Sequence, residues 1–306
     1  MANGEIFISP NSDSKTALNK FFYYMTDKDV FRIKIRGFDA KGQHLKLASS
    51  RPGILSIEQS SRTGQLEQTI IVRAKGLGIA TIHAYDSASS SGAYLGYCPP
   101  TIGGVYKNCF PTLTVNVLSK IKRETLADGL SENERAMLMV LLAETKTPSA
   151  PGLKYNEKDA VKSMQYMRRA LLNRFTFSHP NRLDVPMNNK TLVGLIRVER
   201  VIAGFSNYPG LSKDVNDHID GLIKAANMGQ NKYFLENRLL IKYAIDVARG
   251  KELHSSLPHI KDVYGWRTQG KEPPGGGYKY IFSLAGQDFY GLEQSFIDDP
   301  NQRKKK

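Results

Sequence analysis

Glu144 is the side chain whose position is best suited to acid–base chemistry. It follows the apolar run MLMVLLA (Met137 to Ala143) and precedes TKTPSAPG, a segment that breaks a helix. A carboxylate at such a boundary is partly desolvated, which raises its pKa toward the range that suits a general acid. Cleavage of a glycosidic bond needs such an acid to protonate the leaving oxygen. On position alone, an exposed or capping glutamate is the alternative.

Other catalytic chemistries find little support in the sequence. The six histidines form no HExxH or paired metal spacing, and the chain has neither a G-x-S-x-G elbow nor a phosphate-binding loop. His218 with Asp214 and Asp217 is a conceivable cation site, although a solvated helix face is favoured. We therefore expect no metal and no cofactor.

Aromatic and amide side chains in the expected loops are candidates for contact with a sugar. Trp266, the single tryptophan, could stack on a pyranose ring or pack its own domain. Tyr208 belongs to the same set of loop aromatics. Asn207 and Asn173 could hydrogen-bond N-acetyl groups, and Asn173 could equally hold a loop from the end of its helix.

The elements that would position these residues are mostly helical after residue 119. Ser131 and Glu134 form a capping box at the start of the apolar helix that ends at Glu144. Further helices are expected over 159–175, 190–201, 215–228 and 233–249 from their apolar spacing. The remainder is rich in Gly, Pro and aromatic residues, and 278–282 with 288–290 predicts a small hairpin.

The first 118 residues predict short strands instead. Phe31 to Arg36 alternates apolar and basic residues, and 54–57, 69–72, 80–84 and 113–117 are further β-rich runs. Strands at this spacing are typical of a sandwich. SSRPGILSI (Ser49 to Ile57) and VRAKGLGIATIHAYD (Val72 to Asp86) resemble the group 2 bacterial Ig-like domain, which usually adheres or acts as a spacer.

The second half resembles the SleB-type cell-wall hydrolases, a lysozyme-like family that cleaves peptidoglycan glycan strands. The segments that carry the resemblance are 138–144 (LMVLLAE), 160–174 (AVKSMQYMRRALLNR), 191–196 (TLVGLI), 203–208 (AGFSNY) and 288–290 (DFY). The family implies that Glu144 is the acid and that Phe205, Ser206 and Tyr290 lie near the sugar groove. Two departures affect substrate placement: ETKTP replaces an EARGE run, and Gly204 stands where many members carry Gln.

This resemblance implies a lytic transglycosylase or a muramidase. In the lytic route one glutamate suffices, whereas a hydrolase would draw on Glu157, Asp159 or Glu199, each of which is otherwise a solvated carboxylate. We therefore expect an α+β chain. An Ig-like sandwich would span 1–118 and a mainly α-helical, lysozyme-like domain with a small β-hairpin 119–306, in which 211–279 is a candidate insertion.

Charge and termini indicate where such an enzyme would work. The net charge of +14 favours a polyanionic partner such as the cell wall. The sequence shows no export signal and no membrane-spanning run. A disulfide between Cys98 and Cys109 would indicate an oxidising compartment, and two free thiols are the alternative.

We thus expect a toxin that is made in the cytoplasm, delivered by type VI secretion and active in the periplasm of a target cell. Its partners would be peptidoglycan, an immunity protein and a component of the secretion apparatus. A phage lysin or a non-catalytic tail or adhesion protein remains the alternative. A nucleic-acid binder is suggested by charge alone, and the chain lacks a basic–aromatic module for it.

Overall fold

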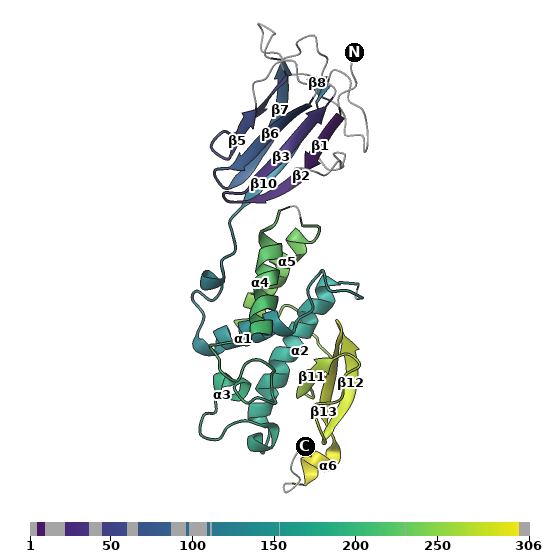
Figure 1. The fold of residues 1–306 in the computed structure, drawn as a ribbon. Coiled ribbons are helices and arrows are strands. Elements are labelled where there is room, and N and C mark those ends of the chain that lie inside the picture. The colour runs from purple at the N-terminus through teal and green to yellow at the C-terminus, as the bar shows by residue number, and fades with distance from the viewer. Residues whose placement is uncertain are drawn as a thin grey trace. The chain divides into compact units, whose positions relative to one another are not determined.

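The chain is α+β and divides into two compact units, Met1–Lys120 with Asn227–Lys232, and Ile121–Ala226 with Tyr233–Lys306 (Figure 1). The structure, a computed structural model, describes residues 5–9, 22–36, 45–59, 67–86, 96–97, 109–110, 112–152, 154–229 and 231–299. Within these residues no helix is both long and apolar enough to cross a bilayer.

Two four-stranded sheets form the first unit, in the orders β1-β3-β6-β5 and β2-β10-β7-β4. A short parallel pair, β8-β9, accompanies them. The predicted Cys98–Cys109 disulfide lies outside the residues whose side chains are described. The strands are β1 (Glu5–Ser9), β2 (Phe22–Thr26), β3 (Val30–Arg36), β4 (Leu45–Ser49), β5 (Leu55–Gln59), β6 (Glu67–Ala74), β7 (Gly78–Asp86), β8 (Gly96–Tyr97), β9 (Cys109–Phe110) and β10 (Leu113–Leu118).

Alternation of side chains brings the two sheets together around one core. In β10 every second residue is buried, beginning at Leu113, because successive residues of a strand point to opposite faces. Val115 and Ile82 from one sheet share a core with Phe31 and Val72 from the other. The first unit is therefore a two-layered β structure, in which the predicted strands are confirmed.

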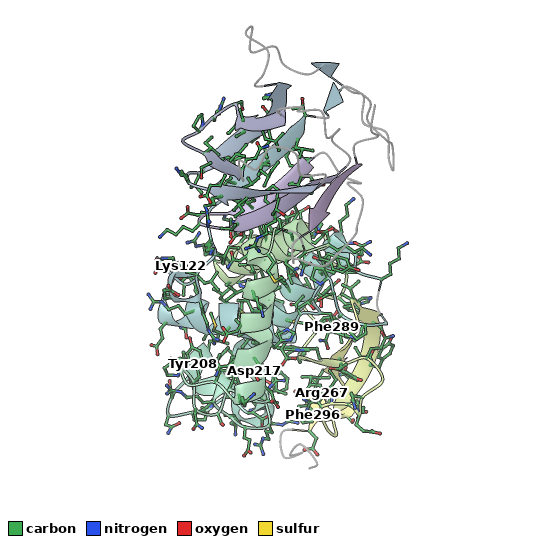
Figure 2. The ribbon with its side chains drawn as sticks, turned by 45° about the horizontal axis from the view of Figure 1, so that its top comes forward. Lys122, Tyr208, Asp217, Arg267, Phe289 and Phe296 are labelled. Carbon is green, nitrogen blue, oxygen red and sulfur yellow. The ribbon has the colours of Figure 1, made fainter. Side chains whose placement is uncertain are left out.

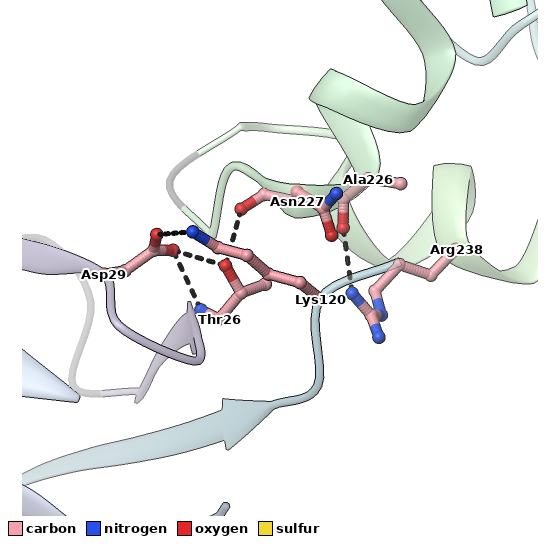
Figure 3. Close-up of polar contacts among 6 residues, drawn as sticks. All are labelled: Thr26, Asp29, Lys120, Ala226, Asn227 and Arg238. Atoms are coloured by element: carbon pink, nitrogen blue, oxygen red, sulfur yellow. Dashed lines mark hydrogen bonds and ion pairs between the residues drawn. The ribbon is translucent and has the colours of Figure 1, made fainter. Parts of the chain in front are cut away.

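Asp29 stabilises the turn between β2 and β3. Asp29 Oδ2 accepts hydrogen bonds from the main-chain N and the hydroxyl of Thr26, at 2.9 Å and 2.7 Å (Figure 3). Asp29 Oδ1 lies 3.4 Å from Lys120 Nζ. The Thr26 hydroxyl oxygen also lies 3.1 Å from the carbonyl oxygen of Asn227, in the short segment that belongs to this unit.

Helices dominate the second unit. Their bounds are α1 (Glu132–Glu144), α2 (Glu157–Thr176), α3 (Leu192–Ile196), α4 (Lys213–Asn227), α5 (Phe234–Ala248) and α6 (Gln294–Asp298), with 3-10 turns at Arg123–Thr125 and Pro180–Leu183. The predicted capping box is confirmed: Ser131 N donates to Glu134 Oε2 at 2.8 Å, and the Ser131 hydroxyl accepts from Glu134 N. α1 is mostly buried from Ala136 to Leu142, and α5 packs against both α1 and α2.

One helical prediction was wrong in extent. The helix expected over 190–201 forms only over Leu192–Ile196, after which the chain continues in turns. Gly194 and the β-branched residues Val193, Val198 and Val201 are weak helix formers, which explains the short element. Thr191 caps its start by accepting a hydrogen bond from Gly194 N.

The predicted hairpin is part of a three-stranded sheet, ordered β11-β13-β12. β12 (Tyr278–Leu284) and β13 (Gln287–Leu292) form the hairpin, and β11 (Gly265–Thr268), which the sequence did not reveal, pairs with β13. β13 is the central strand, and all six of its residues are buried. Phe289 contacts Tyr166 of α2 with ring centroids 5.3 Å apart.

Residues 211–279, considered a candidate insertion, supply α4, α5 and β11. Leu240, Ile241 and Ala244 of α5 are buried in the same core as Leu138 and Leu141 of α1. Apart from Asn227–Lys232, which belongs to the first unit, this segment is therefore an integral part of the second unit.

Candidate active site

Glu144 is the last residue of α1 and lies where a buried helix reaches the surface. The three residues Val140, Leu141 and Leu142 are fully or almost fully buried, and Glu144 itself is partly exposed. Thr145 adopts an extended conformation, with φ −80° and ψ 130°, which ends the helix. The carboxyl group is thus held at the end of a rigid element.

The three-stranded sheet contacts Glu144 at two points. Trp266 Nε1 of β11 donates a hydrogen bond to Glu144 Oε2 at 3.2 Å. Gln287 Nε2 of β13 donates to the main-chain carbonyl oxygen of Glu144 at 2.8 Å. Because Trp266 pairs with Phe289, two residues along β13 from Gln287, both contacts come from the same face of the sheet.

The surroundings of Glu144 raise its pKa. Burial of the carboxyl is the largest cause, and the hydrogen bond from Trp266 and the positive charge of Arg267 oppose it without cancelling it. The protonated form therefore persists to a higher pH than in an exposed glutamate, as a general acid requires. The partial desolvation expected from the sequence is confirmed.

His218 of α4 lies at the same end of α1. Burial lowers the pKa of its imidazole, and a hydrogen bond with the main-chain carbonyl of Leu142 partly offsets this shift. Asp217 forms an ion pair with Lys213. Among the residues that the structure describes, no group of His, Cys, Asp or Glu side chains is arranged to hold a metal ion.

Trp266 contacts Glu144 directly, and Asn173 contacts the loop that leads to Trp266. The Trp266 side chain is 9% exposed and its N–H is used by Glu144. The buried Asn173 amide donates to the carbonyl oxygens of Ile260, Lys261 and Val263, at 3.1, 3.2 and 2.8 Å. Asn173 therefore holds the loop that leads into β11, one of the two roles considered for it.

The turn that carries Phe205 and Tyr208 lies away from Glu144. Phe205 is fully buried in the core, and Tyr208 stacks on it with ring centroids 6.4 Å apart. Burial raises the pKa of Tyr208, and the charges of Glu132 and Arg135, at the start of α1, also act on it. The 13-residue helix is about 20 Å long, so this turn and Glu144 are at opposite ends.

Figure 2 shows Tyr208 on a different side of the unit from Arg267, whose charge acts on Glu144. Ser206 and Asn207, in the same turn, are exposed. The structure therefore does not bring Phe205, Ser206, Asn207 and Tyr208 together with Glu144.

Tyr290 points away from Glu144 as well. It pairs with Gly265 and Tyr280, whereas Trp266 pairs with the adjacent residue Phe289, so Tyr290 and Trp266 face opposite sides of the sheet. Tyr290 is 3% exposed. It belongs to a small apolar cluster with Phe177, Leu183, Tyr278, Leu292 and Phe296.

Sequence reasoning did not identify Gln287, Arg267 or His218 as neighbours of the Glu144 end of α1. Arg267 directly follows Trp266, a predicted site residue, so its position in the sequence could have indicated that it lies near the site. Gln287 and His218 carried no such signal, because their relation to α1 depends on how β13 and α4 pack.

A separate apolar groove of about 560 Å³ lies along α5. None of the predicted site residues lines it. Its walls are formed by Ile121, Leu126, Leu235, Arg238, Leu239, Ile241, Lys242, Ile245, Asp246 and Arg249.

No protein-family model matches the chain, and no curated protein does. Solved structures of a surface-layer protein are weakly similar to part of it. The S-layer protein rSbsC(31-844) is 13% identical over 34% of this chain and 12% of its own, with a TM-score of 0.24. SbsC domains 4 and 5 are 14% identical over 37% of this chain and 53% of their own, with a TM-score of 0.22.

Proposed function

We propose that the protein cleaves the glycan strands of peptidoglycan, with Glu144 as the general acid and base. The observation that carries this proposal is the raised pKa of a partly buried carboxyl group that ends a rigid helix and is oriented by Trp266. A protonated carboxyl in such a place can donate to the oxygen of a glycosidic bond. In this proposal the second unit is lysozyme-like and the first is Ig-like.

The reaction would proceed in two proton transfers. Glu144 gives its proton to the glycosidic oxygen as the bond to the anomeric carbon breaks, and the leaving sugar departs as an alcohol. The Glu144 carboxylate then accepts the proton of the muramic acid 6-hydroxyl as that oxygen bonds to the anomeric carbon. The positive charge of Arg267 and the Trp266 N–H, which both favour the ionised form, would stabilise the carboxylate between these transfers.

A route with a single catalytic carboxylate fits the described surroundings. No other carboxylate in the described part of the chain contributes to the pKa shift of Glu144. Glu157 accepts a hydrogen bond from the Tyr243 hydroxyl at 2.8 Å, and Glu199 is exposed. We therefore favour the lytic outcome, which needs no second carboxylate, over hydrolysis.

The setting that we propose is the periplasm of a target bacterium, reached by type VI secretion. An immunity protein in the producing cell and a component of the secretion apparatus would then be its partners. The net charge of +14 supports attraction to an anionic wall. The β unit would serve adhesion or loading.

The test compares wild type, Glu144→Gln and the matched control Glu199→Gln on purified sacculi, with products identified by mass spectrometry. We expect wild type and Glu199→Gln to release fragments with anhydromuramic ends, and Glu144→Gln to be slower by about 10²-fold or more. Reducing muramic ends would indicate hydrolysis. Intact sacculi with all three proteins would refute the proposal and favour a structural or adhesive role.

A further inference from the structure

Gln287 occupies a place that the fold defines closely. It is the first residue of β13 and follows a two-residue turn, Ala285-Gly286, in which both residues have positive φ, +50° and +77°. Such a turn matches the twist of a hairpin and fixes its register, here pairing Leu284 with Gln287. Gln287 also pairs with Thr268 of β11 and is only 3% exposed.

Its amide group is fixed in one orientation. Gln287 Nε2 donates to the carbonyl oxygen of Glu144, which is one of the final helical carbonyls without a partner inside α1. Rotating the amide would place oxygen against oxygen, so Oε1 must point elsewhere. Among the described residues, the buried Gln287 Oε1 has no hydrogen-bond partner, and the same holds for the hydroxyl of Thr145, which is 3% exposed.

These two buried atoms lie near the same carbonyl group. Thr145 is bonded to Glu144, and Gln287 donates to the Glu144 carbonyl oxygen, so both side chains adjoin the same peptide group. One is a hydroxyl that can donate and the other is an acceptor only. A water molecule that accepts from Thr145 and donates to Gln287 would satisfy both, as buried waters commonly do.

We propose that Gln287 is a positioning residue for Glu144, and that Gln287 and Thr145 together bind one internal water at the end of α1. Gln287 ties the last turn of the helix to β13, and Trp266 holds the carboxyl from the neighbouring strand β11. β13 therefore holds the main chain of Glu144, and β11 holds its side-chain carboxyl. The catalytic consequence rests on the proposed function, but the positioning itself does not.

The single tryptophan allows a test that needs no catalysis. Because Trp266 donates to the Glu144 carboxyl, its fluorescence should change when that group ionises. We expect a titration step in wild type with a midpoint above the ordinary glutamate range, and no such step in Glu144→Gln. A step that persists in Glu144→Gln would show that another group titrates, and the fluorescence step could then not be assigned to the Glu144 carboxyl.

Gln287→Met keeps the length of the side chain and removes its hydrogen bonds, and Gln294→Met is the exposed control. We expect Gln287→Met to lower the midpoint, because a loosened helix end admits water to the carboxyl. On sacculi its kcat should fall by about tenfold with KM unchanged, as for a misplaced catalytic group. A midpoint and kcat equal to those of wild type and Gln294→Met would overturn the positioning role.

Thr145→Val replaces the hydroxyl with a methyl group and serves as the second variant, including the case in which Gln287→Met does not fold. We expect a smaller shift of the midpoint in the same direction. An unchanged midpoint in Thr145→Val would overturn the shared water. A shift in both variants without cleavage of sacculi by wild type would support the positioning of Glu144 while refuting the proposed function.

Discussion

Glu144 illustrates how a single residue gains its chemistry from burial. Its carboxyl is partly shielded from water at the end of α1, and the resulting rise in pKa exceeds the opposing effects of Trp266 and Arg267. Holding this charge in a dry place is costly for folding, because the unfolded chain solvates the carboxylate fully. Activity and stability should therefore respond to Glu144 in opposite directions.

Glu144→Gln should accordingly become more stable than wild type as the pH rises. The folded-state pKa is raised, so the native protein binds the proton more tightly, and wild type loses stability between the ordinary glutamate pKa and the folded value. Below both values the two proteins should melt alike. Melting temperatures between about pH 4 and about pH 8 check this, and parallel curves throughout that range would contradict it.

At the scale of elements, the link between α2 and β11 matters most for the site. Asn173, near the end of α2, donates hydrogen bonds to the carbonyl groups of Ile260, Lys261 and Val263. Arg174 Nε donates to the Tyr264 carbonyl at 2.9 Å. Trp266 follows this loop directly. The placement of the indole beside Glu144 therefore depends on a polar anchor in another helix.

Asn173→Leu should loosen this anchor. It leaves three carbonyl groups without their donor, which costs about 1–3 kcal/mol, and cleavage should slow because Trp266 shifts. Asn207→Leu is the matched control at an exposed asparagine and should stay within about 0.5 kcal/mol. Urea unfolding measures both, and equal stabilities of the two variants would contradict the assigned role of Asn173.

At the scale of the whole molecule, the net charge of +14 belongs to both halves of the sequence and not to one arm. A chain of this charge is drawn to any polyanion, so attraction alone does not specify a substrate. In the proposed function, charge would concentrate the protein on the wall and Glu144 would decide what happens there.

Binding of Glu144→Gln to sacculi should therefore weaken with salt, while the sacculi stay intact. We expect the bound fraction to fall between about 50 mM and about 500 mM NaCl, because the Debye length shortens. Sacculi whose carboxyl groups have been amidated should bind less at low salt. Cosedimentation measures both, and binding that is independent of salt would indicate that charge does not contribute.

Local patterns in the sequence were sufficient for most elements and for the setting of Glu144. Alternation in β10 encodes which face of the strand is buried, and the apolar run of α1 encodes a buried helix. The Ser131–Glu134 capping box marks where that helix begins, and all three are properties of neighbouring residues. They place Glu144 at the end of a buried helix. Local patterns also predict the hairpin of β12 and β13, but not the third strand of that sheet, β11.

Only the tertiary structure decided which side chains meet Glu144. Trp266 and Gln287 are 122 and 143 positions away in the sequence, and a difference of one residue in β13 turns Tyr290 to the opposite face. Phe205 and Tyr208 share the expected aromatic turn but pack at the other end of α1. Local periodicity fixes the buried face of each element, whereas its neighbours depend on packing summed over the entire core.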